Sequence, residues 1–156
     1  AGPRAAQRAA RAQRPALERR AAQLGLGDRL ELRPAVSSTA VPEALRGLDV
    51  LVLPSRTTPS WKEQFGRVLI EAMSCGVPVV GSSSGEIPNV IGDAGLVFPE
   101  GDVGALRATL ARLAGEPALR AELARRGRER VLAQFTQAAV ARRHVEVYAA
   151  MLGRTP

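Results

Sequence analysis

The chain alternates between segments with a helical hydrophobic period and short apolar segments typical of strands. Helical spacing predicts helices over residues 3–24, 42–47, 66–75, 86–91 and 102–115, and in two stretches that begin at Pro117 and Thr136. Apolar or alternating runs predict strands over residues 29–36, 49–54, 77–80 and 94–98. Strands separated by helices indicate an α/β fold: a Rossmann-like, doubly wound parallel sheet flanked by helices, with a helical C-terminal tail. Ligands of such folds bind beyond the carboxyl ends of the strands.

Local signals place several element boundaries. Gly76 follows a helical segment at a position where a left-handed residue is favoured. Asp102 and Thr136 precede helical segments and are suited to cap them. Pro34 cannot donate to a ladder, so the first predicted strand is expected near the sheet edge. The last helix is expected to have an apolar face made of Val140, Val145, Val147, Tyr148 and Met151.

Length and composition predict one domain over residues 1–156. With 46% hydrophobic but only 3% aromatic residues, its core is expected to consist of Leu, Val, Ile and Ala. The single cysteine, Cys75, cannot form an intrachain disulfide, which favours the cytoplasm. No apolar run approaches the ~20 residues of a membrane span. We therefore expect a soluble cytoplasmic protein, with peripheral association at the inner membrane face left open.

The net charge of +7 comes from 22 basic and 15 acidic residues. All the basic residues except Lys62 are arginines, and they are spread along predicted helices between Leu and Ala. A nucleic-acid-binding surface would gather them into one block with stacking aromatics. The pattern therefore predicts solvated helix faces and no nucleic-acid partner, although attraction to anionic substrates remains open.

The segment from Glu63 to Glu71 has the most informative chemistry. It places a carboxylate in the loop after a predicted strand, then Gly66, and then the start of a helix. Amides at a helix N-terminus are unpaired and lie at the positive end of the dipole, which suits them to a diphosphate. Gly66 allows that backbone to come close to a ligand.

A helical wheel of this segment separates two sides at about 100° per residue. The apolar side faces the sheet, and the other side contains Arg67, Glu71 and Ser74. Glu71 is thereby free to bind the vicinal hydroxyls of a ribose, since a carboxylate accepts two hydrogen bonds at once. From the residues alone, an exposed ion pair between Glu71 and Arg67 is the favoured interpretation, and Glu63 would be an ordinary loop acid.

Residues 49–102 resemble a known family. They contain Asp-Val-Leu-Val-Leu-Pro-Ser, two glutamates eight positions apart, Glu-Ala-Met-Ser-Cys-Gly-Val-Pro-Val-Val and Ala-Gly-Leu-Val-Phe-Pro-Glu-Gly-Asp. These motifs resemble the C-terminal, donor-binding domain of retaining glycosyltransferases of the GT-B fold, group 1 and family 4 type. That family is typified by glycogen and sucrose-phosphate synthases and bacterial mannosyltransferases. Ala1-Gly-Pro and residues 28–36 extend the likeness weakly.

The resemblance implies roles for particular residues. Glu63 would be catalytic, contacting the transferred sugar and stabilising its oxocarbenium-like transition state. Glu71 would bind the ribose, and the main chain around Val36 the nucleobase. The donor sugar and diphosphate would be bound by Gln64, Phe65, Gly66, Arg67 and Val68. The family usually has Gly where this chain has Gln64, and a paired glycine within the stretch Gly81-Ser-Ser-Ser-Gly-Glu.

The same resemblance implies a substrate but no cofactor. The donor would be a UDP- or GDP-hexose, the acceptor a glycan, a lipid or a small molecule, and no metal is expected. The chain would lack the family's first strand-helix unit and its N-terminal acceptor domain, so alone it is expected to be inactive. A nucleotide-sugar epimerase and a non-catalytic donor-binding fragment are the alternatives. Of the remaining residues, His144 is expected on a solvated surface and Cys75 to be packed and inert.

Overall fold

The computed structural model describes residues 3–153, with only the backbone of residues 3–12. It divides into two compact units, Ala1–Ser37 and Ser38–Pro156. In the first, α1 (Pro3–Gln23) confirms the helix predicted over residues 3–24. Gly25 ends α1 with φ of 66°, and the Leu26 amide donates to the carbonyl of Ala21 at 2.8 Å. This is the Schellman arrangement that a glycine after a helix predicts.

The strand predicted over residues 29–36 is wrong. A short 3₁₀ helix, η1 (Gly27–Arg29), stands at its start, and residues 30–37 have no regular secondary structure. Leu30 and Val36, two of the apolar positions of the alternation, are 38% and 49% exposed. Alternation specifies a strand only where one side of it is buried on a core, and Pro34 removes a ladder donor besides.

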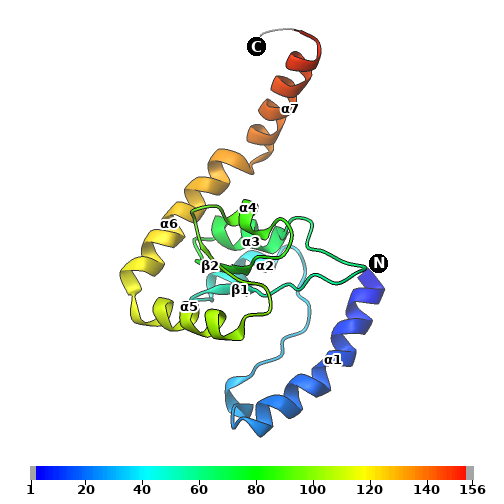
Figure 1. Cartoon of the computed structure of the whole chain (residues 1–156), viewed down its shortest axis with the longest axis vertical. Helices are drawn as coiled ribbons and strands as arrows, with labels where there is room; N and C mark the ends of the chain where they lie inside the picture. The colour runs from blue at the N-terminus through cyan, green and yellow to red at the C-terminus, as the bar shows by residue number, and fades with distance from the viewer. Residues whose placement is uncertain (1–2, 154–156) are drawn as a thin grey trace. The chain divides into compact units, whose positions relative to one another are not determined.

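The second unit is built on a parallel sheet of order β1 (Leu51–Leu53), β2 (Val79–Ser82) and β3 (Leu96–Phe98). Leu53 aligns with Gly81, and Ser82 aligns with Phe98. Six helices accompany the sheet (Figure 1): α2 (Val41–Arg46), α3 (Arg67–Ser74), α4 (Ile87–Ile91), α5 (Val103–Gly115), α6 (Pro117–Gln134) and α7 (Gln137–Met151). The predicted α/β fold with a parallel sheet is confirmed.

Helices cover both faces of this sheet, because successive strand residues point to opposite sides. On one face, Leu51, Leu53 and Val79 pack with buried residues of α3 and α4, among them Leu69, Met73 and Ile87. On the other face, Val52, Val80 and Leu96 pack with Leu113 of α5 and Leu123 of α6. Leu, Val, Ile and Ala make up most of both cores, as the composition predicts, with Met73 buried in the first and Phe98 in the second.

Glycines on either side of the start of β2 have different roles. A side chain on Gly81 would stand 2.3 Å from Cγ2 of Ile87, so α4 packs directly on the strand there. The strand continues to Ser82, two residues beyond the predicted end at Val80, because Gly81 and Ser82 pair with Val97 and Phe98 of β3. Gly76, after α3, has φ of 74°, which confirms the left-handed position predicted for it.

The predicted helix caps are confirmed in the second half of the chain. The Asp102 carboxylate accepts from the Ala105 amide at 2.8 Å and begins α5. The Thr136 hydroxyl accepts from the Ala139 amide at 3.2 Å and begins α7. Each satisfies one of the unpaired amides of a helix start. The predicted apolar face of α7 lies largely exposed: Val140, Val145, Val147, Tyr148 and Met151 are 36–77% accessible.

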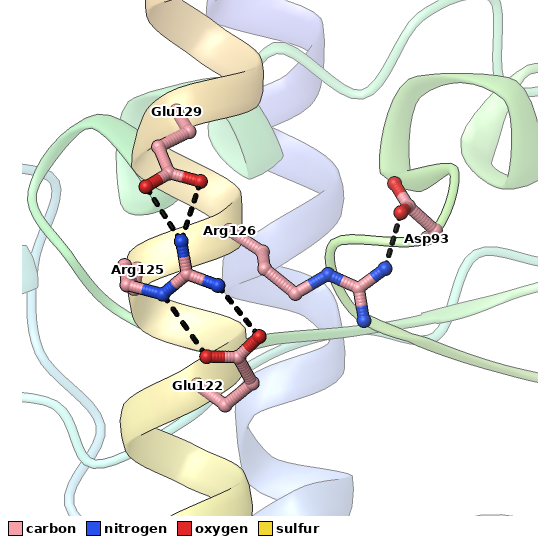
Figure 2. Close-up of polar contacts among 5 residues, drawn as sticks. All are labelled: Asp93, Glu122, Arg125, Arg126 and Glu129. Atoms are coloured by element: carbon pink, nitrogen blue, oxygen red, sulfur yellow. Dashed lines mark hydrogen bonds and ion pairs between the residues drawn. The ribbon is translucent and has the colours of Figure 1, made fainter.

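The arginines divide into two groups, so their interpretation as solvated helix faces is wrong in part. Arg125 fits it: the guanidinium forms a ladder with Glu122 and Glu129 on the exposed side of α6, and Figure 2 shows this arrangement. Arg126 reaches out of the helix to Asp93, in the segment after α4 (Figure 2).

Three other arginines bind the carbonyl ends of helices. Arg128 donates to the carbonyl of Ser74, the last residue of α3, at 2.7 Å. Arg130 donates to the carbonyls of Val90 and Asn89 in α4, at 2.9 and 2.7 Å. Arg120 donates to the carbonyls of Leu113 and Ala114 at the end of α5. Cations at helix C-termini satisfy unpaired carbonyls and complement the dipole, so these side chains fasten α6 to its neighbours.

Candidate functional site

The carboxyl ends of the three strands are joined by hydroxyl and carboxylate side chains. The Ser82 hydroxyl, at the end of β2, donates to the carbonyl of Ser55 after β1 at 2.6 Å. The Thr57 hydroxyl lies 2.9 Å from that of Ser84, which is 1% exposed. Glu100, after β3, accepts from Thr57 through both carboxylate oxygens. The loops that follow β1, β2 and β3 therefore form one connected site, at the end of the sheet where α/β folds bind ligands.

Glu63 lies in the β1–α3 loop, residues 54–66, and its carboxylate is held on both oxygens. Oε2 accepts from the Ser55 hydroxyl at 3.1 Å, and Oε1 accepts from the Gly66 amide at 3.0 Å. The side chain is half-buried. The backbone carbonyl of Glu63 accepts from the Glu86 amide at 3.1 Å, which ties this loop to the segment after β2. The carboxylate is therefore fixed beside the start of α3.

Gly66 joins this loop to α3 and is buried. Its φ of 75° lies in the left-handed region. A side chain there would stand 3.0 Å from Cδ1 of Leu69 and 3.1 Å from Cδ2 of Leu53. The first bond of the turn runs from the Leu69 amide to the Gly66 carbonyl at 2.8 Å. The amides of Arg67 and Val68 precede that bond and lie at the positive end of the helix dipole, the arrangement that suits anionic groups.

The side chains of α3 separate as the helical wheel predicts. Leu69, Ala72 and Met73 are fully buried against the sheet, and Ser74 is exposed. Glu71 forms an ion pair with Arg67, whose Nε lies 3.3 Å from its Oε1, and the two side chains are 38% and 82% exposed. An exposed i, i+4 pair contributes a few tenths of a kcal/mol, about 0.3–0.5. The pair therefore exists, yet it is weak enough to leave the Glu71 carboxylate available to a ligand.

The remaining predicted residues lie in different surroundings. Gln64 is exposed. The Phe65 ring packs edge-on against Phe135, with ring centroids 5.9 Å apart. Val36 belongs to the first unit and residues 63–71 to the second. Within the second unit, the predicted catalytic, diphosphate and ribose residues lie together in the β1–α3 loop and the first turns of α3.

Two residues set aside as non-catalytic are placed as expected. His144 is exposed and its Nδ1 lies 2.8 Å from the Val140 carbonyl, one turn back along α7. Cys75 is half-buried, and its sulfur lies 3.8 Å from the carbonyl of Pro42. Within residues 3–153, no three His, Cys, Asp or Glu side chains gather as a metal site.

Glu100 is the site residue that sequence reasoning did not single out. Its hydrogen bonds from the Thr57 hydroxyl and amide hold the pKa of its carboxyl below its ordinary range, with smaller contributions from Ser84 and from the nearby Arg56. The signal in the sequence was an acidic residue two positions after the apolar run that became β3, within the motif Ala-Gly-Leu-Val-Phe-Pro-Glu-Gly-Asp. Polar residues at strand ends are candidates in any parallel sheet, but its partner is 43 residues away in the chain.

Comparison with known proteins gives the family of the chain. Residues 11–130 match the family model described as glycosyl transferases group 1. A D-inositol 3-phosphate glycosyltransferase from Streptomyces avermitilis is 35% identical over 111 residues, 70% of this chain and 23% of that protein. This chain thus spans about a quarter of the length of that curated relative.

Solved structures share the fold. A sucrose-phosphate synthase from Thermosynechococcus elongatus matches with a TM-score of 0.75 at 31% identity, over 91% of this chain and 35% of that one. HepE from Anabaena, solved in complex with UDP, matches with a TM-score of 0.77 at 21% identity, over 87% and 36% of the two chains. Among the residues the structure describes, no helix is both long and apolar enough to cross a bilayer.

Proposed function

The chain belongs to the glycosyl transferases group 1 family, and from that premise we propose that it binds a nucleotide-activated hexose, linked to UDP or GDP, for transfer with retention of anomeric configuration. The observation that carries the proposal is the fixed carboxylate of Glu63, held by Ser55 and by the Gly66 amide at the carboxyl end of the sheet. A carboxylate preorganised there is suited to stabilise the positive charge that develops on a sugar ring as its bond to the diphosphate breaks.

The diphosphate would be bound by the start of α3. The amides of Arg67 and Val68 lie there, directly after the left-handed Gly66, and the other residues of the segment 64–68 would contact the donor sugar. As the bond to the sugar breaks, negative charge grows on the diphosphate, and amides at the positive end of a helix stabilise it without having to reorganise.

Glu71 would bind the nucleotide ribose. It lies one turn into α3, is partly exposed, and has two oxygens to accept from two adjacent hydroxyls. The main chain around Val36 would bind the base. We propose that the donor is the only small molecule required, with no metal cofactor, so that full-length activity survives treatment with EDTA.

The rest of the protein would supply the acceptor site. This chain spans about a quarter of the curated relative described above, so we propose that it binds donor alone but does not transfer, and that the acceptor is a glycan, a lipid or a small molecule. The proposed location is the cytoplasm or the inner face of a membrane. We propose no nucleic-acid partner, which predicts weak DNA affinity that vanishes by about physiological salt.

Titration calorimetry on the full-length protein tests the donor assignment. UDP, GDP and UDP-glucose are the probes, UDP and UDP-glucose because HepE, a fold neighbour, has been solved with both. We expect one of the two nucleotides to bind, and Glu71→Gln to weaken that binding about ten-fold or more, which is the loss of one or two charged hydrogen bonds. The matched control is Glu116→Gln, a carboxylate paired i, i+4 with Arg112 on the surface. Equal affinities of wild type and Glu71→Gln would contradict the assignment.

A further inference from the structure

The Glu100 side chain is bound by the β1–α3 loop through two separate donors. The Thr57 amide donates to Oε1 at 2.5 Å, and the Thr57 hydroxyl donates to Oε2 at 2.8 Å. The Glu100 amide in turn donates to the Ser83 hydroxyl at 2.9 Å. Glu100 thus contacts both the loop that follows β1 and the loop that follows β2.

The proton of Thr57 fixes the direction of the next bond. A hydroxyl has a single proton, and that of Thr57 points to Glu100. The hydroxyl of Ser84, 2.9 Å away and buried, must therefore donate to Thr57. Loss of the Glu100 carboxylate would free Thr57 to rotate and would disturb a buried hydrogen bond as well as an exposed one.

Thr57 lies in the segment between Ser55 and Glu63. Ser55, which binds the Glu63 carboxylate, is two residues before it. A tight turn begins directly after it, in which the amides and carbonyls of Thr58 and Trp61 bond each other at 2.8 and 3.2 Å. Two residues after that turn comes Glu63. The contact with Glu100 therefore anchors the base of the segment that presents the Glu63 carboxylate.

We propose that Glu100 is a positioning residue for Glu63, acting through Thr57 to hold the β1–α3 loop in the geometry that the donor sugar requires. This inference rests on the proposed function. Glu100 touches no substrate in this role. Because the contact presents two donors, an N–H and an O–H, only a side chain with two acceptor atoms at that reach satisfies both.

Four variants of the full-length protein separate this role from general stability. Glu100→Gln keeps one acceptor oxygen and turns an N–H₂ toward one of the two donors of Thr57. Glu100→Asp keeps both acceptor oxygens on a side chain shorter by one methylene. Thr57→Ser keeps both donors and is the conservative rescue. Glu116→Gln removes a surface carboxylate far along the chain, at the end of α5, and is the matched control.

Hydrogen exchange and kinetics are the two readouts. For Glu100→Gln we expect faster amide exchange confined to residues 55–66, together with a loss in kcat of about ten- to a hundred-fold, the scale of a reacting group displaced by about 1 Å. Donor KM should change far less, Thr57→Ser should lose far less kcat than Glu100→Gln, and Glu116→Gln should match the wild type. Should Glu100→Gln fail to fold, Glu100→Asp is expected to show the same pattern more weakly.

The outcomes distinguish this inference from the function on which it rests. Exchange in residues 55–66 that stays at wild-type rates in Glu100→Gln overturns the positioning role whether or not the protein transfers sugar. So does faster exchange with unchanged kcat. A wild-type protein that transfers no sugar overturns the proposed function instead, and the exchange rates alone then decide whether Glu100 holds the loop.

Discussion

The backbone carbonyl of Glu63 occupies the place where a side chain on Gly85 would stand. A Cβ at Gly85 would lie 1.9 Å from that oxygen, and the neighbouring amide of Glu86 donates to the same oxygen at 3.1 Å. Gly85 also has φ of 57°, in the left-handed region. The segment after β2 thus packs directly against the backbone that presents the Glu63 carboxylate, and it can do so only without a side chain.

Gly85→Ala is therefore expected to damage both stability and activity. The left-handed conformation alone costs about 1–2 kcal/mol for a residue with a Cβ. The Cβ would also clash with a backbone atom, so the clash can be relieved only by moving the backbone of Glu63. We expect a lower melting temperature and a kcat reduced more than donor KM. Thermal denaturation and steady-state kinetics of the full-length protein measure the two effects.

Gly115→Ala is the control for this change. Gly115 ends α5, its φ is not in the left-handed region, and a Cβ there would meet no atom within 4 Å. It should leave kcat unchanged and raise stability by at most about 1 kcal/mol, through a less flexible unfolded chain. If both alanines behave alike, the close approach of Gly85 to Glu63 has no functional weight.

Arg130 is expected to contribute more to stability than its surface position implies. It donates to the carbonyls of Val90 and Asn89, and its guanidinium lies 5.8 Å from the centre of the Phe135 ring. Hydrogen bonds to charged groups contribute about 1.5–3 kcal/mol, so Arg130→Met should lower the free energy of unfolding by about that amount in urea denaturation.

Arg143→Met is the matched substitution on α7, at an exposed position. It removes the same charge and should change the free energy of unfolding by less than about 0.5 kcal/mol. Similar losses in the two variants would mean that overall charge, and not the carbonyls of α4, accounts for the effect of Arg130.

Sequence reasoning worked where the relevant partners are close in the chain. Gly66 and Glu63 are three residues apart and their bond is local, so the loop-to-helix unit could be inferred from spacing. The caps by Asp102 and Thr136 are local for the same reason. β2, which lies between β1 and β3, was recognisable because a buried parallel strand is apolar on both faces.

The errors concern information that only the folded chain contains. Gly81 was assigned to a loop, yet it lies in β2, where it pairs with Leu53 and Val97, and the close packing of α4 leaves no room for a side chain. The carbonyls bound by Arg128 and Arg130 lie 54 and 40–41 residues away in the chain. Glu100 and Thr57 are 43 residues apart. A sequence pattern predicts that such side chains are polar but not which groups they meet.

The contact between Glu100 and Thr57 should make stability depend on pH in a defined direction. Its hydrogen bonds lower the pKa of Glu100 in the folded protein below its ordinary value of 4.5. A depressed carboxyl pKa gives stability that is fully present above the unfolded value and is lost as pH falls through the lower folded value. The difference in melting temperature between wild type and Glu100→Gln should therefore be constant from about pH 6 to 8 and shrink as pH falls below about 4.5.

Glu116→Gln is again the control, because it also removes one negative charge from a chain of net charge +7 but leaves the hydrogen bonds of Glu100 intact. Its difference from wild type should be small throughout the same pH range. A Glu100→Gln difference that grows toward acid pH would show the opposite sign and contradict the hydrogen bonds assigned to that carboxylate.

Glu63 and Glu71 should fail in different ways when each is changed to glutamine in the full-length enzyme. Glu63 is fixed in the loop where the reacting sugar is proposed to lie, whereas Glu71 is one turn into α3 where the ribose is proposed. An interaction that strengthens in the transition state lowers kcat when it is lost, whereas one made equally in both states raises KM. Glu63→Gln should therefore act mainly on kcat and Glu71→Gln mainly on donor KM, each by about 1.5–3 kcal/mol, or roughly ten- to a hundred-fold.

Thermal stability provides the internal check on this split. Glu71 has an exposed partner, so Glu71→Gln should change the melting temperature very little. Glu63→Gln keeps one acceptor oxygen and replaces the other by an N–H₂. The Gly66 amide cannot rotate and needs the remaining oxygen, whereas the Ser55 hydroxyl can turn away from the N–H₂. We therefore expect a modest loss of stability from this variant alone. If kcat falls only in proportion to the melting temperature across these variants, Glu63 has a structural role in the loop and no catalytic one. If donor kinetics are unchanged in both variants, the segment from Glu63 to Glu71 is not part of the active site.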